Sequence, residues 1–281
     1  MRAYSCFCDM GHFFRKEFSR LGEVRSLIPR NCPLMALTAT ATTQTRNSIV
    51  KILGMVDPHI ICISPHKPNI LYWIAEKGGL QETFQPLIDK LRVQRIKMER
   101  VLIFCRRYEE CADIYELFKC SLGIDFTEPI GSPDLSVYRL VDMYTSITQK
   151  EVKDTILKAI CNPMSHLRVV ICTISFGMGI NCPDIRQVIH WGPSEDIEAY
   201  IQETGRAGRD GKLSCALLFV SKTDFTAKGR YRKVNSSMLN YCKVQSCRRS
   251  FLLSEFDPDD QPNPTGCSCC DICASECVYQ L

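Results

Sequence analysis

Short β-branched apolar runs alternate along this chain with longer stretches of helical spacing, and this alternation constrains the fold more than any other feature. Five runs have the length and residue types of buried strands: residues 59–64, 101–105, 169–174, 187–191 and 215–220. Between them, residues 108–122 and 148–161 place apolar side chains on one helical face and polar ones opposite. Strands that alternate with amphipathic helices predict a parallel α/β fold. Functional side chains are then expected directly after the strands, because such sheets bind ligands at the carboxyl ends of their strands.

The chain divides by pattern into three segments. Residues 1–73 contain alternating helix and strand patterns, and residues 74–225 contain a complete α/β series. In residues 226–281 the strand patterns stop, and basic residues and cysteines become more frequent. A polar, proline-rich stretch at residues 257–264 predicts a loop inside this last segment.

The composition is that of a globular chain and gives no sign of secretion. Of the 281 residues, 45% are hydrophobic and 23% are charged, and the formal charge is only +4, so any contact with nucleic acid must come from local basic patches. No apolar run has the character of a signal peptide or the length of a membrane span, so we expect a chain that is not secreted and has no membrane partner. The 18 cysteines are then expected to be mostly free thiols in a reducing compartment.

The strongest catalytic signal is the string YIQETGRAGRDG at residues 200–211. Arg206 and Arg209 are three residues apart, which places both side chains on one side of a helix, and the small residues beside them allow a ligand to approach. Arginine suits bidentate recognition of phosphate and the charge that develops on a transferring phosphoryl group. A solvated basic helix end is the alternative interpretation, which this short motif alone does not exclude.

Two further segments follow predicted strands. Residues 175–181, SFGMGIN, form a glycine-rich turn after the run at 169–174, where an α/β fold binds ligands. Residues 36–42, ALTATAT, lead from a strand into a helix. Their threonine hydroxyls either cap this helix or couple a nucleotide site to a DNA site, and the threonines alone favour capping.

TATAT, FGMGIN and QETGRAGRDG, in this order and near these separations, resemble the superfamily 2 helicases, and the RecQ helicases most closely. The resemblance runs from about residue 6 to residue 273. In that family, two RecA-like domains clasp ATP between them and move along single-stranded DNA in the 3′-to-5′ direction. The resemblance implies an incomplete first RecA-like domain at residues 1–73, a complete second RecA-like α/β domain at 74–225, and a helical RecQ-type zinc-binding subdomain at 226–281.

The resemblance also implies roles in handling ATP. Arg209 would be the arginine finger, Arg206 a second phosphate contact and Gln202 a link between nucleotide and DNA. Gly179 and Asn181 would lie near the ATP. The elements of this family that hold the phosphates and Mg²⁺ are not in the sequence, because no GxxxxGK[ST] loop occurs and the positions of the acidic box read RAYS at residues 2–5. ATP and Mg²⁺ are therefore cofactors of the parent family, and we expect little or no hydrolysis by this chain alone.

Contacts with DNA are implied at several places. An aromatic-rich loop that senses single-stranded DNA would lie at residues 10–15, although Met10 and Phe13 stand where the family has tryptophan and aspartate. Residues 67–69, KPN, match the family's RPN element. The residues expected to contact DNA are His12, Phe14, Arg15, Lys67, Asn69, Thr145 and Ser146, and those expected to couple DNA to nucleotide are Thr38 and Thr40. An ordinary surface role is the alternative for each DNA contact.

A group of cysteines near the C-terminus has the spacing of a structural zinc site. The pattern C-x19-C-x2-C-x2-C supplies four thiolates for tetrahedral zinc, and its flanks CRRSFLL and CDIC match the RecQ zinc module. The predicted ligands are Cys247, Cys267, Cys270 and Cys273, and the neighbours that could be mistaken for ligands are Cys242, Cys269 and Cys277. The zinc would stabilise a small segment with little core of its own, and free thiols are the interpretation without metal.

Three functional hypotheses stay open. The chain belongs to an ATP-dependent 3′-to-5′ DNA helicase of recombination and repair, as a fragment or splice form. Alternatively it is a short protein without a motor, either a non-catalytic module that binds single-stranded or forked DNA, or a zinc-stabilised module that binds other helicase or repair proteins. The family implies a nuclear location in a eukaryote and a cytoplasmic one otherwise.

Overall fold

A computed structural model describes residues 3–5, 21–29, 32–177, 182–225, 234–257 and 269–277 of the chain. These residues belong to two compact units. The smaller unit comprises Met1–His66 with Ser250–Asn263, and the larger comprises Lys67–Arg249 with Pro264–Leu281. The three-segment division of the sequence stays a prediction.

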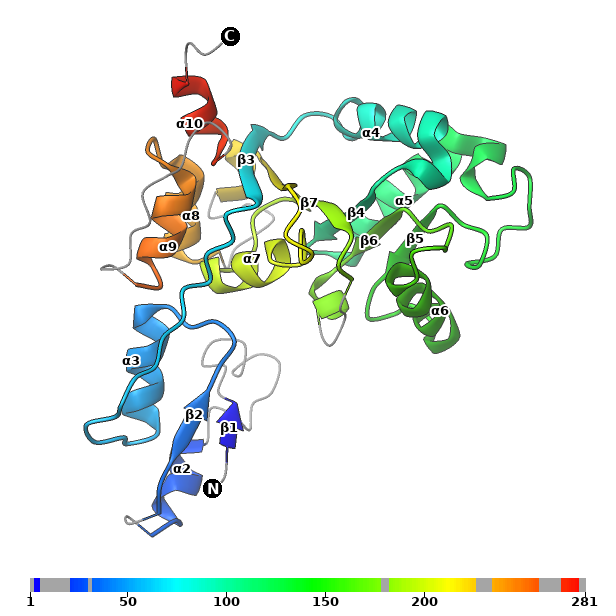
Figure 1. The fold of residues 1–281 in the computed structure, drawn as a ribbon. Coiled ribbons are helices and arrows are strands. Elements are labelled where there is room, and N and C mark those ends of the chain that lie inside the picture. Colours follow the sequence, from blue (N-terminus) through cyan, green and yellow to red (C-terminus); the bar gives the residue numbers. More distant parts are fainter. Residues whose placement is uncertain are drawn as a thin grey trace. The chain divides into compact units, whose positions relative to one another are not determined.

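The larger unit is built on a six-stranded sheet in which every strand pair is parallel (Figure 1). The spatial order of the strands is β3-β8-β7-β4-β6-β5. Their bounds are β3 (Ile70–Glu76), β4 (Arg100–Cys105), β5 (Val141–Tyr144), β6 (Val169–Cys172), β7 (Ile185–Trp191) and β8 (Ser214–Val220). The parallel α/β fold and the four strands predicted within this unit are confirmed.

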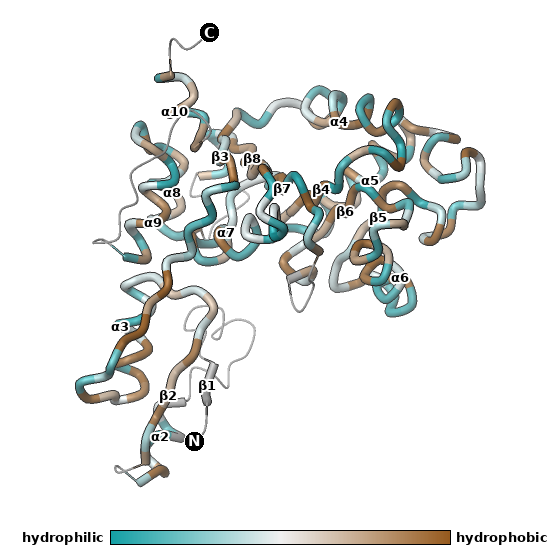
Figure 2. Tube along the Cα trace, in the orientation of Figure 1, coloured by the Kyte–Doolittle hydropathy of each residue, from teal (hydrophilic) through white to brown (hydrophobic). Residues whose placement is uncertain are grey.

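Amphipathic helices connect these strands. They are α4 (Leu80–Gln94), α5 (Tyr108–Leu122), α6 (Lys150–Cys161) and α7 (Ile197–Thr204). Hydrophobic and hydrophilic residues alternate along α4, as burial of one helical face requires (Figure 2). Phe84 of α4 contacts Phe118 of α5 and Trp191 of β7, so a continuous core joins these two helices to the sheet. The predicted helices at 108–122 and 148–161 are confirmed, the second beginning two residues later than predicted.

The smaller unit contains a parallel pair of strands, β1 (Ala3–Ser5) and β2 (Met35–Leu37), with the helices α2 (Leu21–Ser26) and α3 (Thr43–Ile52). Thr42 caps α3, since its hydroxyl accepts a hydrogen bond from the backbone N–H of Thr45 at 3.2 Å. Helix capping by a threonine of the ALTATAT run is therefore confirmed.

The strand predicted at residues 59–64 is wrong. The structure has no strand there, and Ile60, Ile61 and Ile63 are exposed by 54%, 81% and 86%. A β-branched run forms a strand only where a neighbouring strand pairs with it, and the described part of the smaller unit pairs no strand with these residues. The run therefore has the composition of a strand without its hydrogen bonds.

Three short helices complete the described C-terminal part: α8 (Ser236–Lys243), α9 (Arg248–Ser254) and α10 (Asp271–Glu276). The bridge between Tyr72 of β3 and Cys270 extends the large sheet at the edge of β3 that does not face β8. This contact brings the cysteine-rich C-terminal residues to the edge of the sheet.

Candidate functional site

Arg206 and Arg209 lie in a series of turns that follows α7, at residues 205–211, called here the arginine turn. The helix ends at Thr204, so the prediction that both arginines extend from one helix is wrong. The reason is local, because Gly208 has a φ of +57°, which a helix does not allow. Arg206 is 8% exposed, whereas Arg209 is exposed to solvent.

Gly208 is required by close packing as well as by its backbone angle. A Cβ atom at this position would lie 2.3 Å from Nδ2 of Asn69 and 2.7 Å from Oγ of Ser214. Its N–H donates a hydrogen bond of 2.9 Å to the carbonyl of Ile185 at the start of β7. The arginine turn is thus fixed against the sheet through the one residue that has no side chain.

Lys67 and Asn69, two residues predicted to contact DNA, hydrogen-bond to the arginine turn. Nζ of Lys67 donates to the carbonyl of Gly205 at 2.5 Å. Nδ2 of Asn69 donates to the carbonyls of Gly208 and Lys212, at 2.8 and 2.9 Å. The KPN element therefore holds the backbone of the turn, a function that its sequence alone does not reveal.

An ion pair also holds the arginine turn. Arg186 of β7 pairs with Asp210 and donates a hydrogen bond to the hydroxyl of Ser214 at 3.1 Å. Arg186 and Asp210 are 12% and 25% exposed, so this pair is partly shielded from water. Together with Asn69, it leaves the backbone of the turn little freedom.

Helix α7, which leads into the turn, is anchored by a buried polar group. A carboxylate oxygen of Glu203 lies 2.9 Å from Nε2 of His190 and accepts a hydrogen bond from the hydroxyl of Ser194 at 2.7 Å. The ring of His190 stacks on Phe104 with a centroid distance of 5.3 Å. All four residues are buried or nearly so, and they fix the helix that carries Gln202.

Three positive charges gather at this turn. Burial, and in addition the charge of Arg209, lower the pKa of Lys67. Burial also lowers the pKa of Arg206, and Arg209 contributes in the same direction. The repulsion between cations that are held close together on a rigid backbone is relieved when an anion binds. Guanidinium groups suit phosphate oxygens best.

The remaining predicted residues are distributed differently. Thr145 is fully buried and its hydroxyl lies 3.2 Å from that of Thr148, so of the predicted pair of phosphate contacts only Ser146 is exposed. Thr38 and Thr40 belong to the smaller unit, where the hydroxyl of Thr38 donates to the carbonyl of Thr40 at 2.8 Å. The predicted residues outside the described part of the chain are His12, Phe14, Arg15, Gly179, Asn181 and Cys267.

Four cysteine sulfurs lie within 4.8 Å of one another. They belong to Cys247, Cys269, Cys270 and Cys273, which we call the cysteine cluster. Zinc–sulfur bonds of about 2.3 Å in a tetrahedron place sulfurs about 3.8 Å apart, so the cluster fits a structural zinc ion. Three members are predicted ligands, and the fourth, Cys269, is the neighbour that the spacing argument set aside.

Burial of the cysteine cluster affects its protonation. Burial, together with a hydrogen bond to Cys247, raises the pKa of the Cys269 thiol to about 12. Burial also raises the pKa of Cys273. Zinc binds the thiolate, so it must displace these protons, and its affinity must fall as the pH falls.

Asp271 joins the cysteine cluster to the sheet. Its carboxylate accepts a hydrogen bond from the backbone N–H of Ile74 in β3 at 3.2 Å and one from Nε of Arg248 at 2.5 Å. Arg249 donates to the carbonyl of Ile70 in the same strand at 2.6 Å. A string of contacts between Tyr72, Tyr200 and Tyr241 connects β3, α7 and α8 in turn. The C-terminal helices therefore support both β3 and the helix that precedes the arginine turn.

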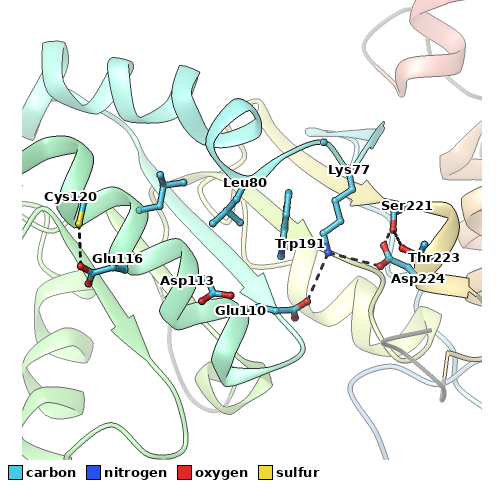
Figure 3. A pocket seen from close by; sticks show the side chains of 12 residues that line it. Lys77, Leu80, Glu110, Asp113, Glu116, Cys120, Trp191, Ser221, Thr223 and Asp224 are labelled. Carbon is cyan, nitrogen blue, oxygen red and sulfur yellow. Dashed lines mark hydrogen bonds and ion pairs between the residues drawn. The ribbon is translucent and has the colours of Figure 1, made fainter. Parts of the chain in front are cut away.

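A cavity of about 750 Å³ opens at the carboxyl ends of β3, β7 and β8, beside α5 (Figure 3). Nζ of Lys77 lies 4.3 Å from the ring centre of Trp191, and 3.9 and 4.0 Å from carboxylate oxygens of Glu110 and Asp224. Among the predicted site residues that the structure describes, none lines this cavity. The buried lysine and carboxylates occupy its inner wall as an internal ion-pair network.

In the described part of the chain, no helix has the length and apolarity that a membrane span requires.

Two family models match the chain. The helicase conserved C-terminal domain matches residues 82–211, which include Gln202 and both arginines of the arginine turn. The RecQ zinc-binding model matches residues 215–274, which include the cysteine cluster. The two matches follow one another along the chain.

Longer proteins are similar to this chain in sequence. The ATP-dependent DNA helicase RecQ of Pasteurella multocida is 31% identical over 95% of this chain and 40% of its own length. The bifunctional 3′-5′ exonuclease/ATP-dependent helicase WRN of Mus musculus is 29% identical over 90% of this chain and 18% of its own length. The chain therefore spans less than half the length of either relative.

Solved structures share the fold at low sequence identity. Dbp5 of S. cerevisiae bound to RNA and ADP BeF3 covers 79% of this chain and 54% of its own, with a TM-score of 0.56 and 17% identity. The helicase Lhr of Mycobacterium smegmatis bound to ssDNA and AMP-PNP covers 73% and 26%, with a TM-score of 0.51 and 17% identity. These similarities concern the fold alone.

Proposed function

From the premise that this chain carries the C-terminal region of a RecQ-type superfamily 2 helicase, we propose that it supplies the second motor domain and the zinc module of an ATP-dependent 3′-to-5′ DNA helicase. One observation carries the proposal: the arginine turn is held by Lys67 and Asn69 of the KPN element and by Arg186 of β7, so its two arginines are displayed on a fixed backbone. A fixed guanidinium stabilises charge in a transition state without reorganising first.

The residues of the arginine turn and of α7 have different roles. Arg209, which is exposed, acts as the arginine finger on the charge that develops at the transferring phosphoryl group. Arg206 makes the second contact with phosphate, and its burial restricts the movement of its side chain. Gln202, on the anchored end of α7, links the nucleotide to the DNA. Single-stranded or forked DNA is the substrate.

A structural zinc ion would be held by Cys247, Cys270 and Cys273, with either Cys267 or Cys269 as the fourth ligand. Zinc supplies stability and no redox or acid–base chemistry in a closed four-thiolate site. The protein's own contribution is to fasten this module to β3 through Asp271 and Arg249. DNA recombination and repair, a nuclear location in a eukaryote, and binding to other repair proteins are part of the proposal through the family.

The 281 residues contain no GxxxxGK[ST] loop, so we expect them to hydrolyse little ATP alone. The decisive experiment places the part of the Pasteurella multocida RecQ that precedes the aligned region in front of this chain and measures ATP hydrolysis with and without single-stranded DNA. The proposal predicts DNA-stimulated hydrolysis that falls by about 10³-fold or more in Arg209→Ala. Arg107→Ala, an exposed arginine at the start of α5, is the matched control and should leave the rate unchanged.

A non-catalytic DNA-binding or helicase-interacting zinc module is the second candidate function, since the cysteine cluster and its anchoring stand without any catalytic step. It predicts salt-sensitive binding of forked DNA by the 281-residue chain in the absence of nucleotide. Hydrolysis by the fused protein that depends on Arg209 favours the helicase, whereas DNA binding without any such hydrolysis favours the module.

A further inference from the structure

Two cysteines far from the cysteine cluster touch each other through their sulfurs. Sγ of Cys161, the last residue of α6, lies 3.1 Å from Sγ of Cys182, which comes shortly before β7. Both thiols are free. Cys161 is exposed to solvent, whereas Cys182 is 1% exposed. One member of the pair can therefore meet a dissolved reagent, and the other can meet only its neighbour.

A buried arginine keeps the two cysteines together. Arg100 of β4, 3% exposed, donates hydrogen bonds to the carbonyls of Ile160 and Asn162, on either side of Cys161. The same guanidinium binds the carboxylate of Asp184, two residues after Cys182, at 2.8 Å. Arg100 thus joins the two segments that carry the cysteines, through backbone carbonyls on the Cys161 side and through the side chain of Asp184 on the Cys182 side.

We propose that Cys161 and Cys182 form a reversible disulfide and are a redox modification site that responds to hydrogen peroxide. The exposed Cys161 thiolate attacks one peroxide oxygen, the O–O bond breaks, and a sulfenic acid and hydroxide result. The sulfur of Cys182 then attacks the sulfenic sulfur, an S–S bond forms, and the S–O bond breaks. The hydroxides leave with the two thiol protons, so two thiols and one peroxide give one disulfide and two water molecules.

The surroundings assign different roles to the two thiols. Burial, and then the hydrogen bond with Cys161, raise the pKa of Cys182 to about 12, so this thiol reacts little with reagents in solution. Its proximity to Cys161 makes it the resolving thiol. Cys105 and Cys111 also interact, but they are 3% and 0% exposed, so neither offers a first site of attack.

The disulfide would close a loop between residues 161 and 182. This loop contains β6 and the residues Gly179 and Asn181, which the helicase resemblance places near ATP. Closing a loop of this length restricts the unfolded chain, so the oxidised protein should melt on the order of 5 °C higher. Neither the disulfide nor this shift depends on the proposed helicase function.

The test uses the zinc-loaded 281-residue protein, purified with a reductant and then freed of it. A graded series of hydrogen peroxide is followed by alkylation of the remaining thiols, tryptic digestion without reduction and mass spectrometry. The expected product joins the peptide of residues 159–168 to that of residues 169–186, with fragment ions that assign the bond to Cys182 and exclude Cys172. Dithiothreitol should remove the link, and the zinc content should stay constant at the peroxide level that produces it.

Matched variants make the result specific. Cys161→Ser, a change at an exposed position, should abolish the linked peptide and the rise in melting temperature, whereas Cys120→Ser, an exposed cysteine on α5, should change neither. Oxidation of Cys161 to sulfinic acid without a link, or linkage of Cys161 to any other cysteine, would overturn the proposal. So would a linked peptide that appears only after zinc is lost, since it would then be a product of unfolding.

Discussion

Nε2 of His190 lies 2.9 Å from the carboxylate of Glu203, which also accepts a hydrogen bond from the hydroxyl of Ser194. This relationship ties the last turn of α7 to the end of β7 and thereby sets the point from which the arginine turn departs. It connects a residue of β7 with a residue of α7 that lies 13 positions later, so this tertiary contact positions the helix.

The Glu203→Gln variant should lower the free energy of unfolding by about 1–3 kcal/mol, because a neutral amide oxygen is a weaker acceptor than a carboxylate for His190 and Ser194, and the amide NH2 adds a donor in a buried region. Urea denaturation measures the change. Glu99→Gln is the control, since the side chain of Glu99 is 60% exposed and pairs with the exposed Lys90, and its substitution should change stability by less than about 1 kcal/mol. Equal effects of the two substitutions would show that the buried carboxylate contributes no more than a surface one.

Gly208→Ala and Gly211→Ala separate backbone strain from close packing in the arginine turn. Both glycines have positive φ, +57° and +81°, so alanine at either costs about 1–2 kcal/mol of backbone strain. A Cβ at Gly211 would meet nothing within 4 Å, whereas one at Gly208 would meet Asn69 and Ser214 at less than 3 Å. Gly208→Ala should therefore destabilise the protein clearly more, as measured by thermal and urea unfolding of both variants. Similar losses would mean that the contacts of Asn69 with the turn are loose.

The charge of Arg209 should be measurable at Lys67. Burial first, and Arg209 second, lower the pKa of Lys67 from its usual value of 10.5. Arg209→Ala removes the second cause only, so the pKa of Lys67 should rise but stay below 10.5, while Arg209→Lys should leave it nearly unchanged. A titration of the Lys67 side chain by NMR measures this. An unchanged pKa in Arg209→Ala would mean that the two cations do not approach each other in solution.

The alternating pattern predicts much of the larger unit, because a buried parallel strand and an amphipathic helix each leave a local signal. The run at 101–105 lies within β4, and the helix at 108–122 has the bounds of α5. The pattern fails at residues 59–64, where composition alone does not show whether a partner strand exists. No predicted strand covers β3, whose residues 70–76 lie on both sides of the predicted segment boundary at residue 73.

The candidate site was predicted in its residue types but not in its contacts. The sequence motifs predict functional roles for Arg206, Arg209, Lys67 and Asn69. A separation of more than 130 residues along the chain hides that Lys67 and Asn69 hold the arginine turn. The Glu203–His190 pair was not predicted, since a glutamate inside a motif and a histidine inside an apolar strand carry no local sign of each other. The spacing of the cysteines favours Cys267 over Cys269, because spacing counts residues along the chain and not distances between sulfurs.

Removal of zinc should loosen the edge of the large sheet, because β3 receives hydrogen bonds from the module that the cysteine cluster holds together. A chelator should lower the melting temperature and expose the backbone amides of β3 to hydrogen exchange, since the N–H of Ile74 loses its bond to Asp271 and that of Tyr72 its bond to the carbonyl of Cys269. Lowering the pH should release zinc in the same way, because protons compete for thiols whose pKa burial raises.

Substitutions identify the ligands in that experiment. Serine in place of Cys247, Cys270 or Cys273 should reduce the bound zinc well below one equivalent, whereas Cys242→Ser, a partly buried thiol outside the cluster, should leave it intact. The geometry of the described residues predicts the same loss for Cys269→Ser, and the spacing of the sequence predicts it for Cys267→Ser instead. If one of these two variants retains a full equivalent of zinc, the cysteine that it replaces is not the fourth ligand. Asp271→Ala should keep the zinc but expose the amide of Ile74, because its carboxylate connects the module to β3 and is not itself a member of the cluster.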